Sequence, residues 1–120
     1  MKINNILYSF NKYLEQERES NNIQKNLGHF IFYQDVEKCI GDIKKITSNF
    51  VYHSTKVNKT FPIYTKVSTL PCRFEHLEEV KEKCAEEALT DFISLMFTEA
   101  MNNKDKFFNT FINGNIEEWK

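Results

Sequence analysis

Residues 73–101 read RFEHLEEVKEKCAEEALTDFISLMFTEAM, a run of twenty-nine residues without proline or glycine. This run predicts one long helix, because proline and glycine are the residues that most strongly disfavour helix interiors. At about 1.5 Å per residue such a helix would extend roughly 43 Å, more than the diameter of a small domain. The other elements are therefore expected to pack along it.

The apolar residues of this helix change their arrangement halfway along. In the first half they form one narrow face: Phe74, Leu77, Val80, Cys84 and Ala88. From Leu89 onward they cover most of the circumference: Phe92, Ile93, Leu95, Met96, Phe97, Ala100 and Met101. The pattern predicts a surface-lying first half and a second half surrounded by other elements, with Phe92 and Met96 among the most buried side chains.

Length and composition predict one globular domain over residues 1–120. A hydrophobic content of 41% with 28% charged residues argues against disorder, and no apolar run approaches the roughly 20 residues that cross a bilayer. The first residues lack the apolar core of a secretory signal, so a soluble, cytoplasmic protein is expected. A net charge of −1 removes the general electrostatic case for nucleic acid or an anionic membrane.

Three cysteines, Cys39, Cys72 and Cys84, are an odd number in a chain long enough to need no disulfide. Two of them lie on apolar helical stripes. The sequence therefore predicts reduced, buried thiols.

The chain before the long helix predicts two further helices. Residues 2–18 form an amphipathic pattern whose apolar side is Ile3, Ile6, Leu7, Phe10 and Leu14. Residues 20–33 are compatible with a helix, a loop or a strand. Within them, a short strand is the preferred interpretation of residues 29–33. Residues 34–48 return to helical spacing, with acidic residues early and Lys44 and Lys45 late, as the helix dipole favours. We predict a helix there, weakened by Gly41.

A hairpin is predicted over residues 50–69, where two segments rich in β-branched and aromatic residues flank residues 58–60. Pro62 has no N–H to donate, so the second strand should lie at a sheet edge there or begin after the proline. After the long helix, Phe108, Phe111, Ile112, Ile116 and Trp119 predict a last amphipathic helix, interrupted near Gly114, that folds back onto the long one. The predicted fold is α+β, a single domain with a long central helix and flanking helices on a small, mainly antiparallel sheet.

The chemical motifs are sparse. Cys72, Glu75, His76 and Glu79 are possible zinc ligands at the start of the long helix, where Cys72 and His76 could lie side by side near Glu79. Cys84 lies two turns further on the core face, so no tetrahedral set is complete and no metal is predicted. Cys72 or Cys39 could pair with His29 or His53 as a nucleophile and base, but nothing orients the imidazole. The three glycines are too far apart for a phosphate loop. We expect no enzymatic activity, no catalytic residues and no cofactor.

The hairpin offers a nucleic-acid alternative. Tyr52, Tyr64, Lys56 and Lys66 are the residue types that stack on bases and contact phosphates from exposed strands. Tyrosine and lysine are also ordinary occupants of a half-exposed sheet, so this interpretation is disfavoured.

An acidic stripe is the most informative feature. Five glutamates recur at helical spacing on one side of the long helix: Glu75, Glu78, Glu79, Glu82 and Glu86. Like charges three or four residues apart each destabilise a helix by a few tenths of a kcal/mol, so the stripe hints at an interface with a basic protein. The alternative is a solvated face that binds nothing. Two effects weaken this argument, the positive helix N-terminus near the first glutamates and the favourable Glu79–Lys83 spacing.

These features predict a small, non-enzymatic protein-binding module that inhibits a partner with a basic surface. An immunity protein or antitoxin that neutralises a toxic nuclease fits this description. The alternatives are a homodimeric regulatory or structural protein, such as a phage or mobile-element inhibitor of a host system, and a small nucleic-acid binder that uses the hairpin. The sequence does not name the partner.

Overall fold

Helix α1, Lys2–Ser20, opens the computed structural model, which describes residues 2–119. Its buried side consists of three apolar residues and one arginine: Ile3, Leu7, Leu14 and Arg18. The helix predicted for residues 2–18 is confirmed. It ends at Ser20 because Asn22 adopts a left-handed conformation, with φ of 58°. The N–H of Ile23 then donates to the Arg18 carbonyl at 2.8 Å, a Schellman-type ending that satisfies the last turn.

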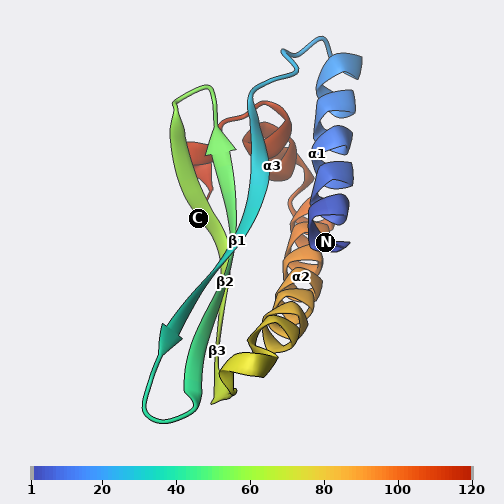
Figure 1. Ribbon diagram of the computed structural model, residues 1–120. Helices are drawn as coiled ribbons and strands as arrows, with labels where there is room; N and C mark the ends of the chain where they lie inside the picture. The colour runs from blue at the N-terminus through green and yellow to red at the C-terminus, as the bar shows by residue number, and fades with distance from the viewer. Residues whose placement is uncertain (1, 120) are drawn as a thin grey trace.

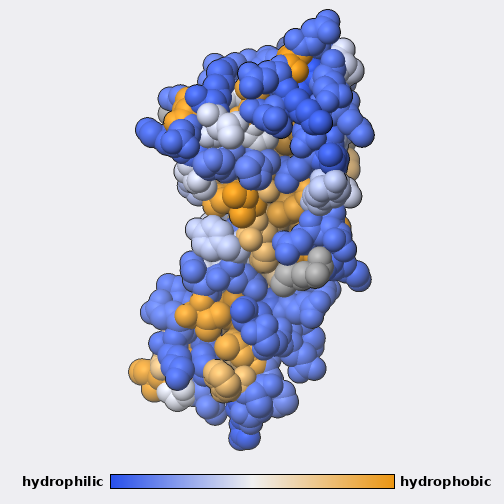
Figure 2. All heavy atoms as spheres, turned by 45° about the horizontal axis from the view of Figure 1, so that its top comes forward, coloured by the Kyte–Doolittle hydropathy of each residue, from blue (hydrophilic) through white to orange (hydrophobic). Residues whose placement is uncertain are grey.

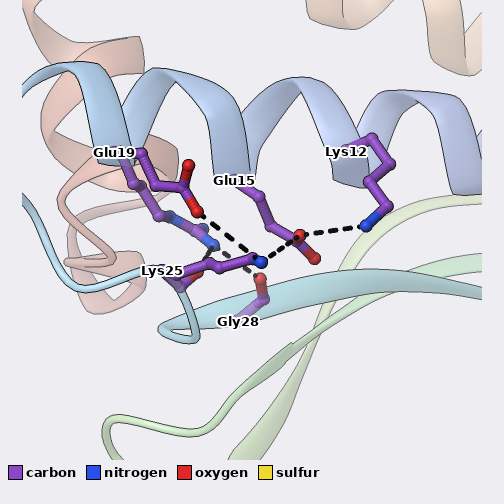
Figure 3. Close-up of polar contacts among 6 residues, drawn as sticks. Lys12, Glu15, Glu19, Lys25 and Gly28 are labelled. Atoms are coloured by element: carbon purple, nitrogen blue, oxygen red, sulfur yellow. Dashed lines mark hydrogen bonds and ion pairs between the residues drawn. The ribbon is translucent and has the colours of Figure 1, made fainter.

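The loop after α1 is tied back to the helix by its own charges (Figure 3). Lys25 lies 3.8 Å from the Glu15 carboxylate and 3.6 Å from that of Glu19, while Lys12 lies 3.5 Å from Glu15. These ion pairs are largely exposed, so each contributes little to stability. The buried Arg18 guanidinium holds the loop more firmly, because its Nη1 donates to the Lys25 and Gly28 carbonyls at 2.9 and 3.1 Å.

Three antiparallel strands form one sheet in the order β1-β2-β3, with β1 Gly28–Lys38, β2 Ile43–Ser54 and β3 Lys59–Pro71. Even-numbered residues of β2 point towards the helices and are buried, among them Ile46, Phe50 and Tyr52. The hairpin predicted over 50–69 is confirmed as β2–β3. The short strand predicted over 29–33 is confirmed and extends to Lys38.

The helix predicted over residues 34–48 is wrong, because this segment contains the end of β1, a turn and the start of β2. Gly41 has a φ of +64° and makes the turn, so it is a turn glycine and not a weak point in a helix. The charges that suggested a helix dipole are explained by the sheet: Glu37 is the cross-strand partner of Lys45. Lys44 points inward and donates to the Cys72 carbonyl at 3.0 Å.

Strand β3 is an edge strand, as Pro62 predicted. The register shifts between Phe50, which pairs with Tyr64, and Val51, which pairs with Pro62. Ile63 is therefore the extra residue of a β-bulge beside the proline.

Helix α2, Leu77–Asn102, follows a 3-10 turn at Phe74–His76 and runs back along the sheet (Figure 1). It confirms the uninterrupted long helix. Its buried residues are Cys84, Ala85, Ala88, Leu89, Phe92 and Met96. Figure 1 shows α1 and α2 on the same side of the sheet, which gives a two-layer α+β domain.

The predicted last helix is a series of short turns: α3 Lys104–Phe107, a π-helical turn Phe108–Ile112 and a 3-10 turn Ile116–Glu118. Gly114, with φ of +79°, separates the last two, as the sequence predicted. Asn103, which makes no side-chain cap for α3, lies where the long helix stops.

The core is an aromatic cluster that joins α2, β1, β2 and the π-helical turn. Phe92 of α2 stacks on Phe50 of β2 with ring centroids 4.4 Å apart and an angle of 7°. Phe30 of β1 contacts Phe92 and Phe111, and Phe111 contacts Tyr52. Phe92 is 1% exposed and Met96 is 5% exposed, which confirms their predicted burial.

The molecule is elongated, with extents of 54 × 28 × 25 Å and a radius of gyration of 16.1 Å. Within residues 2–119, none of the helices combines the length and apolar character of a bilayer span. All three cysteines are unpaired. Cys72 and Cys84 are buried as predicted, whereas Cys39 is exposed because it follows β1 and does not lie on a helix.

Candidate protein-binding surface

The five predicted glutamates lie together on the solvent side of α2 and of the turn before it; we call Glu75, Glu78, Glu79, Glu82 and Glu86 the acidic face. All five are exposed. At 3.6 residues per turn they fall within an arc of about 100° around the helix axis. The structure therefore brings every member of the predicted site to one surface.

Few cations neutralise the acidic face. Glu78 lies 3.7 Å from Lys81, and Glu79 lies 3.7 Å from His76, both as exposed pairs. The Glu79–Lys83 pair that the sequence suggested is replaced by the His76 contact. Among residues 2–119, no lysine, arginine or histidine lies within 4.0 Å of the carboxylates of Glu75, Glu82 or Glu86.

A different carboxylate of α2 holds the helix to the sheet. Asp91 Oδ2 accepts hydrogen bonds from Lys66 Nζ at 2.8 Å and from the Tyr64 hydroxyl at 2.9 Å. The bonds from Lys66 and Tyr64 lower the pKa of Asp91, and the bond with Asp91 raises the pKa of Lys66. Asp91 thus has a structural role that the five glutamates of the acidic face do not share.

The hairpin residues of the nucleic-acid alternative do not share a surface. Tyr52 is fully buried in the aromatic core, and Tyr64 and Lys66 are engaged by Asp91. Lys56 donates to the Asn115 side chain at 2.7 Å. Stacking and phosphate contacts would need these side chains on one exposed strand face. Instead, Tyr52 lies in the core, Tyr64 and Lys66 contact Asp91, and Lys56 contacts Asn115.

The metal candidates are also separated. The buried Cys72 thiol donates to the Arg73 carbonyl at 3.5 Å, whereas His76 is exposed and faces Glu79. Cys84 is buried on the opposite side of α2 from the acidic face. In the described part of the chain, no three histidine, cysteine or acidic side chains are placed to share a metal ion.

The proposed thiol–imidazole pairs do not form. His29 and His53 face each other across β1 and β2, with ring centroids 5.6 Å apart. Cys39 and Cys72 follow the other ends of β1 and β3, about 30 Å away at the rise of an extended strand. Neither His29 nor His53 is therefore within reach of these two thiols.

An apolar groove beside the acidic face was missed by the sequence reasoning. We call it the apolar groove. It has a volume of 420 Å³ and is lined by Ile6, Phe10, Tyr13, Ile93, Met96, Phe97, Ala100 and Phe107. Figure 2 shows hydrophobic residues gathered in exposed patches on an otherwise mostly hydrophilic face.

The prediction that other elements surround the second half of α2 is wrong on this side, because Phe97 is 65% exposed and Met101 is 69% exposed. The signal for the groove was present in the sequence. Ile93, Phe97 and Ala100 continue the helical spacing of the glutamates.

Comparison of the chain with models of protein families, with curated proteins and with solved structures finds no match. The function must therefore be argued from the geometry of the site.

Proposed function

We propose that this chain is a small, non-enzymatic protein-binding module that inhibits a partner through the acidic face of α2. The partner presents a basic surface, and a nuclease whose cleft is lined with lysine and arginine is the best fit, as for an immunity protein or antitoxin. The observation that carries the proposal is the set of five exposed glutamates, three of them without a cation within 4.0 Å among the described residues.

The energetics favour docking over a passive surface. Glutamates three and four residues apart repel one another, at a cost of a few tenths of a kcal/mol per pair in the free helix. A basic partner would remove this repulsion and add attraction, and opposite surface charges also accelerate association. The rigid attachment of α2 to the aromatic core means that little ordering entropy would be lost on binding.

Charge reversal tests the proposal. The variant Glu79→Lys/Glu82→Lys should keep the helical circular dichroism of the wild type, because both side chains are exposed. It should fail to co-purify with a basic protein encoded beside it, and association of the wild type should slow as salt rises. A matched control, Asp35→Lys/Glu117→Lys, changes the net charge equally away from α2 at exposed positions, with Asp35 opposite the uncharged Thr47, and should bind as the wild type does.

Equal binding by the Glu79→Lys/Glu82→Lys variant would refute the proposal. A mass that doubles with concentration in the absence of any partner would instead favour the homodimeric alternative.

A further inference from the structure

The apolar groove lies on the same side of α2 as the acidic face. Glu82, Glu86, Ile93, Phe97 and Ala100 follow one another at steps of four, seven, four and three residues within one continuous α-helix. Such steps keep side chains on one face of a 3.6-residue helix. One stripe of α2 therefore changes from glutamates to apolar residues, over roughly 27 Å from Glu82 to Ala100.

The lining of the groove selects an apolar occupant. Of its eight side chains only Tyr13 carries a polar atom, and Met96 and Phe107 are buried beneath it. Ile6 and Phe97, which are 38% and 65% exposed, leave its mouth open. A volume of 420 Å³ lies within the range of ligand pockets and accommodates more than one large aliphatic or aromatic side chain.

The two ends of the groove differ in charge. Beyond one end Glu82 and Glu86 have no cation within 4.0 Å among residues 2–119. Near the other end the acidic residues Glu99 and Asp105 are offset by two exposed lysines, Lys104 and Lys106. An occupant that complements both features is apolar along the groove and basic at one end only.

We infer that the groove receives the apolar side of an amphipathic helix from the partner protein, with lysine or arginine at the end of that helix over Glu82 and Glu86. This inference rests on the proposed function and specifies the segment of the partner that docks. A groove between two helices suits a helical occupant, whose anchors recur at steps of three, four and seven residues.

The chain does not itself supply such a segment. The basic residues of α1 are widely spaced, at Lys2, Lys12 and Arg18, and Arg18 is buried. Lys81 and Lys83 of α2 lie among glutamates. A second copy is therefore a poor occupant.

A designed peptide tests the inference without knowledge of the partner. The probe is a synthetic helix of about 18 residues, the length that matches the stripe, with leucines along one side and lysines at one end. The control peptide has the same composition with the leucines distributed around the helix. Calorimetry should detect binding of the first and not of the second, and methyl signals of Ile93, Met96 and Ala100 should shift on binding.

Three variants locate the site. Ala100→Trp should fill the groove and weaken binding at least about tenfold, as loss of a central anchor does. Ile40→Trp adds the same side chain at a hairpin tip where Ile40 is 90% exposed, and should change nothing. Glu82→Lys/Glu86→Lys should weaken binding and remove its salt dependence. Circular dichroism and thermal unfolding establish that each variant is folded, and Phe97→Asp, at an exposed position, provides a second disruption of the groove.

The outcomes separate the inference from the proposed function. If both peptides bound equally well, and only Glu82→Lys/Glu86→Lys abolished their binding, the groove inference would be overturned and the acidic face would remain as the docking site. Absence of binding, or binding unaffected by Ala100→Trp and Phe97→Asp, would also overturn it. A concentration-dependent dimer that Ala100→Trp abolishes would overturn it in favour of a second copy.

Discussion

Arg18 is a buried guanidinium whose partners are carbonyl and hydroxyl oxygens instead of a carboxylate. It is 1% exposed, and each of its five N–H groups has an acceptor. Nε donates to Ile112, Nη1 to Lys25 and Gly28, and Nη2 to Phe111 and the Tyr52 hydroxyl, at 2.7–3.1 Å. Burial lowers its pKa from the ordinary value, and the complete set of hydrogen bonds offsets the loss of hydration.

Replacement of Arg18 should therefore be severe. Arg18→Ala leaves several buried carbonyls without donors, and at about 1–3 kcal/mol for each unsatisfied group the loss should be on the order of 3–5 kcal/mol or more. Arg18→Lys should also destabilise, since an ammonium has three donors in a different geometry. Urea unfolding measures both, with Lys12→Ala on the same helix as the control. A loss below about 1 kcal/mol for Arg18→Ala would show that water replaces the guanidinium.

His29 gives stability a dependence on pH. The His29 side chain is exposed, but partial desolvation lowers its pKa from 6.5, and the neighbouring His53 and Arg18 lower it further, while Glu15 acts in the opposite direction. The unfolded chain therefore binds a proton more readily than the native state. The contribution of neutral His29 to the free energy of unfolding is complete above pH 6.5. It is lost as the pH falls through the lower pKa that His29 has in the native state.

The variant His29→Gln should unfold with a shallower pH dependence than the wild type just below pH 6.5. Denaturant midpoints measured across that interval test this. Parallel curves for the two proteins would show that His29 titrates alike in both states.

At the scale of elements, Phe92 is the aromatic residue through which α2 packs on the sheet, against Phe50 of β2 and Phe30 of β1. Phe92→Ala removes the ring stacked on Phe50 and should cost about 3–5 kcal/mol, because a buried phenylalanine leaves a cavity that close packing cannot fill. Phe97→Ala, five residues further along and 65% exposed, is the matched control and should cost under about 1 kcal/mol. Chemical denaturation compares the two, and similar losses would contradict the assignment of faces on α2.

The sequence correctly predicted the elements whose spacing of apolar residues fits only one kind of secondary structure. Residues 73–101 contain no breaker, and residues 50–69 combine β-branched residues with a turn, so α2 and the hairpin followed directly. The prediction for residues 34–48 was wrong because the spacing of the apolar residues fits two structures. Phe32, Val36, Ile43 and Ile46 match the steps of one helix, and they also match the alternation of two strands. The pairing of Glu37 with Lys45, which decides between them, is a tertiary contact.

One part of the candidate site could be predicted from the sequence and the other could not. The acidic face needs only the geometry of one helix, so it was predictable. The groove brings Ile6 and Phe10 against Ile93 and Phe97, residues far apart in the chain, and the packing of α1 on α2 cannot be read from either segment alone.

For the whole molecule, shape gives a further prediction. A compact domain of this length has a radius of gyration of about 13–14 Å, against the observed 16.1 Å. The protein should therefore elute from gel filtration ahead of globular standards of its mass, while sedimentation equilibrium gives 14.3 kDa at all concentrations. A mass that rises towards twice this value on concentration would show self-association instead.

The contact of Arg18 with the C-terminal turns also sets an order for biosynthesis. Arg18 is separated from Phe111 and Ile112 by 93 and 94 positions, so the guanidinium emerges from the ribosome long before two of its acceptors exist. Until residues 111 and 112 have followed, α1 cannot close over the core, and its apolar side stays open to chaperones and proteases. A chain truncated before Phe111 and released from the ribosome should accordingly be cleaved in α1, whereas a released chain that extends past Ile116 should be protected.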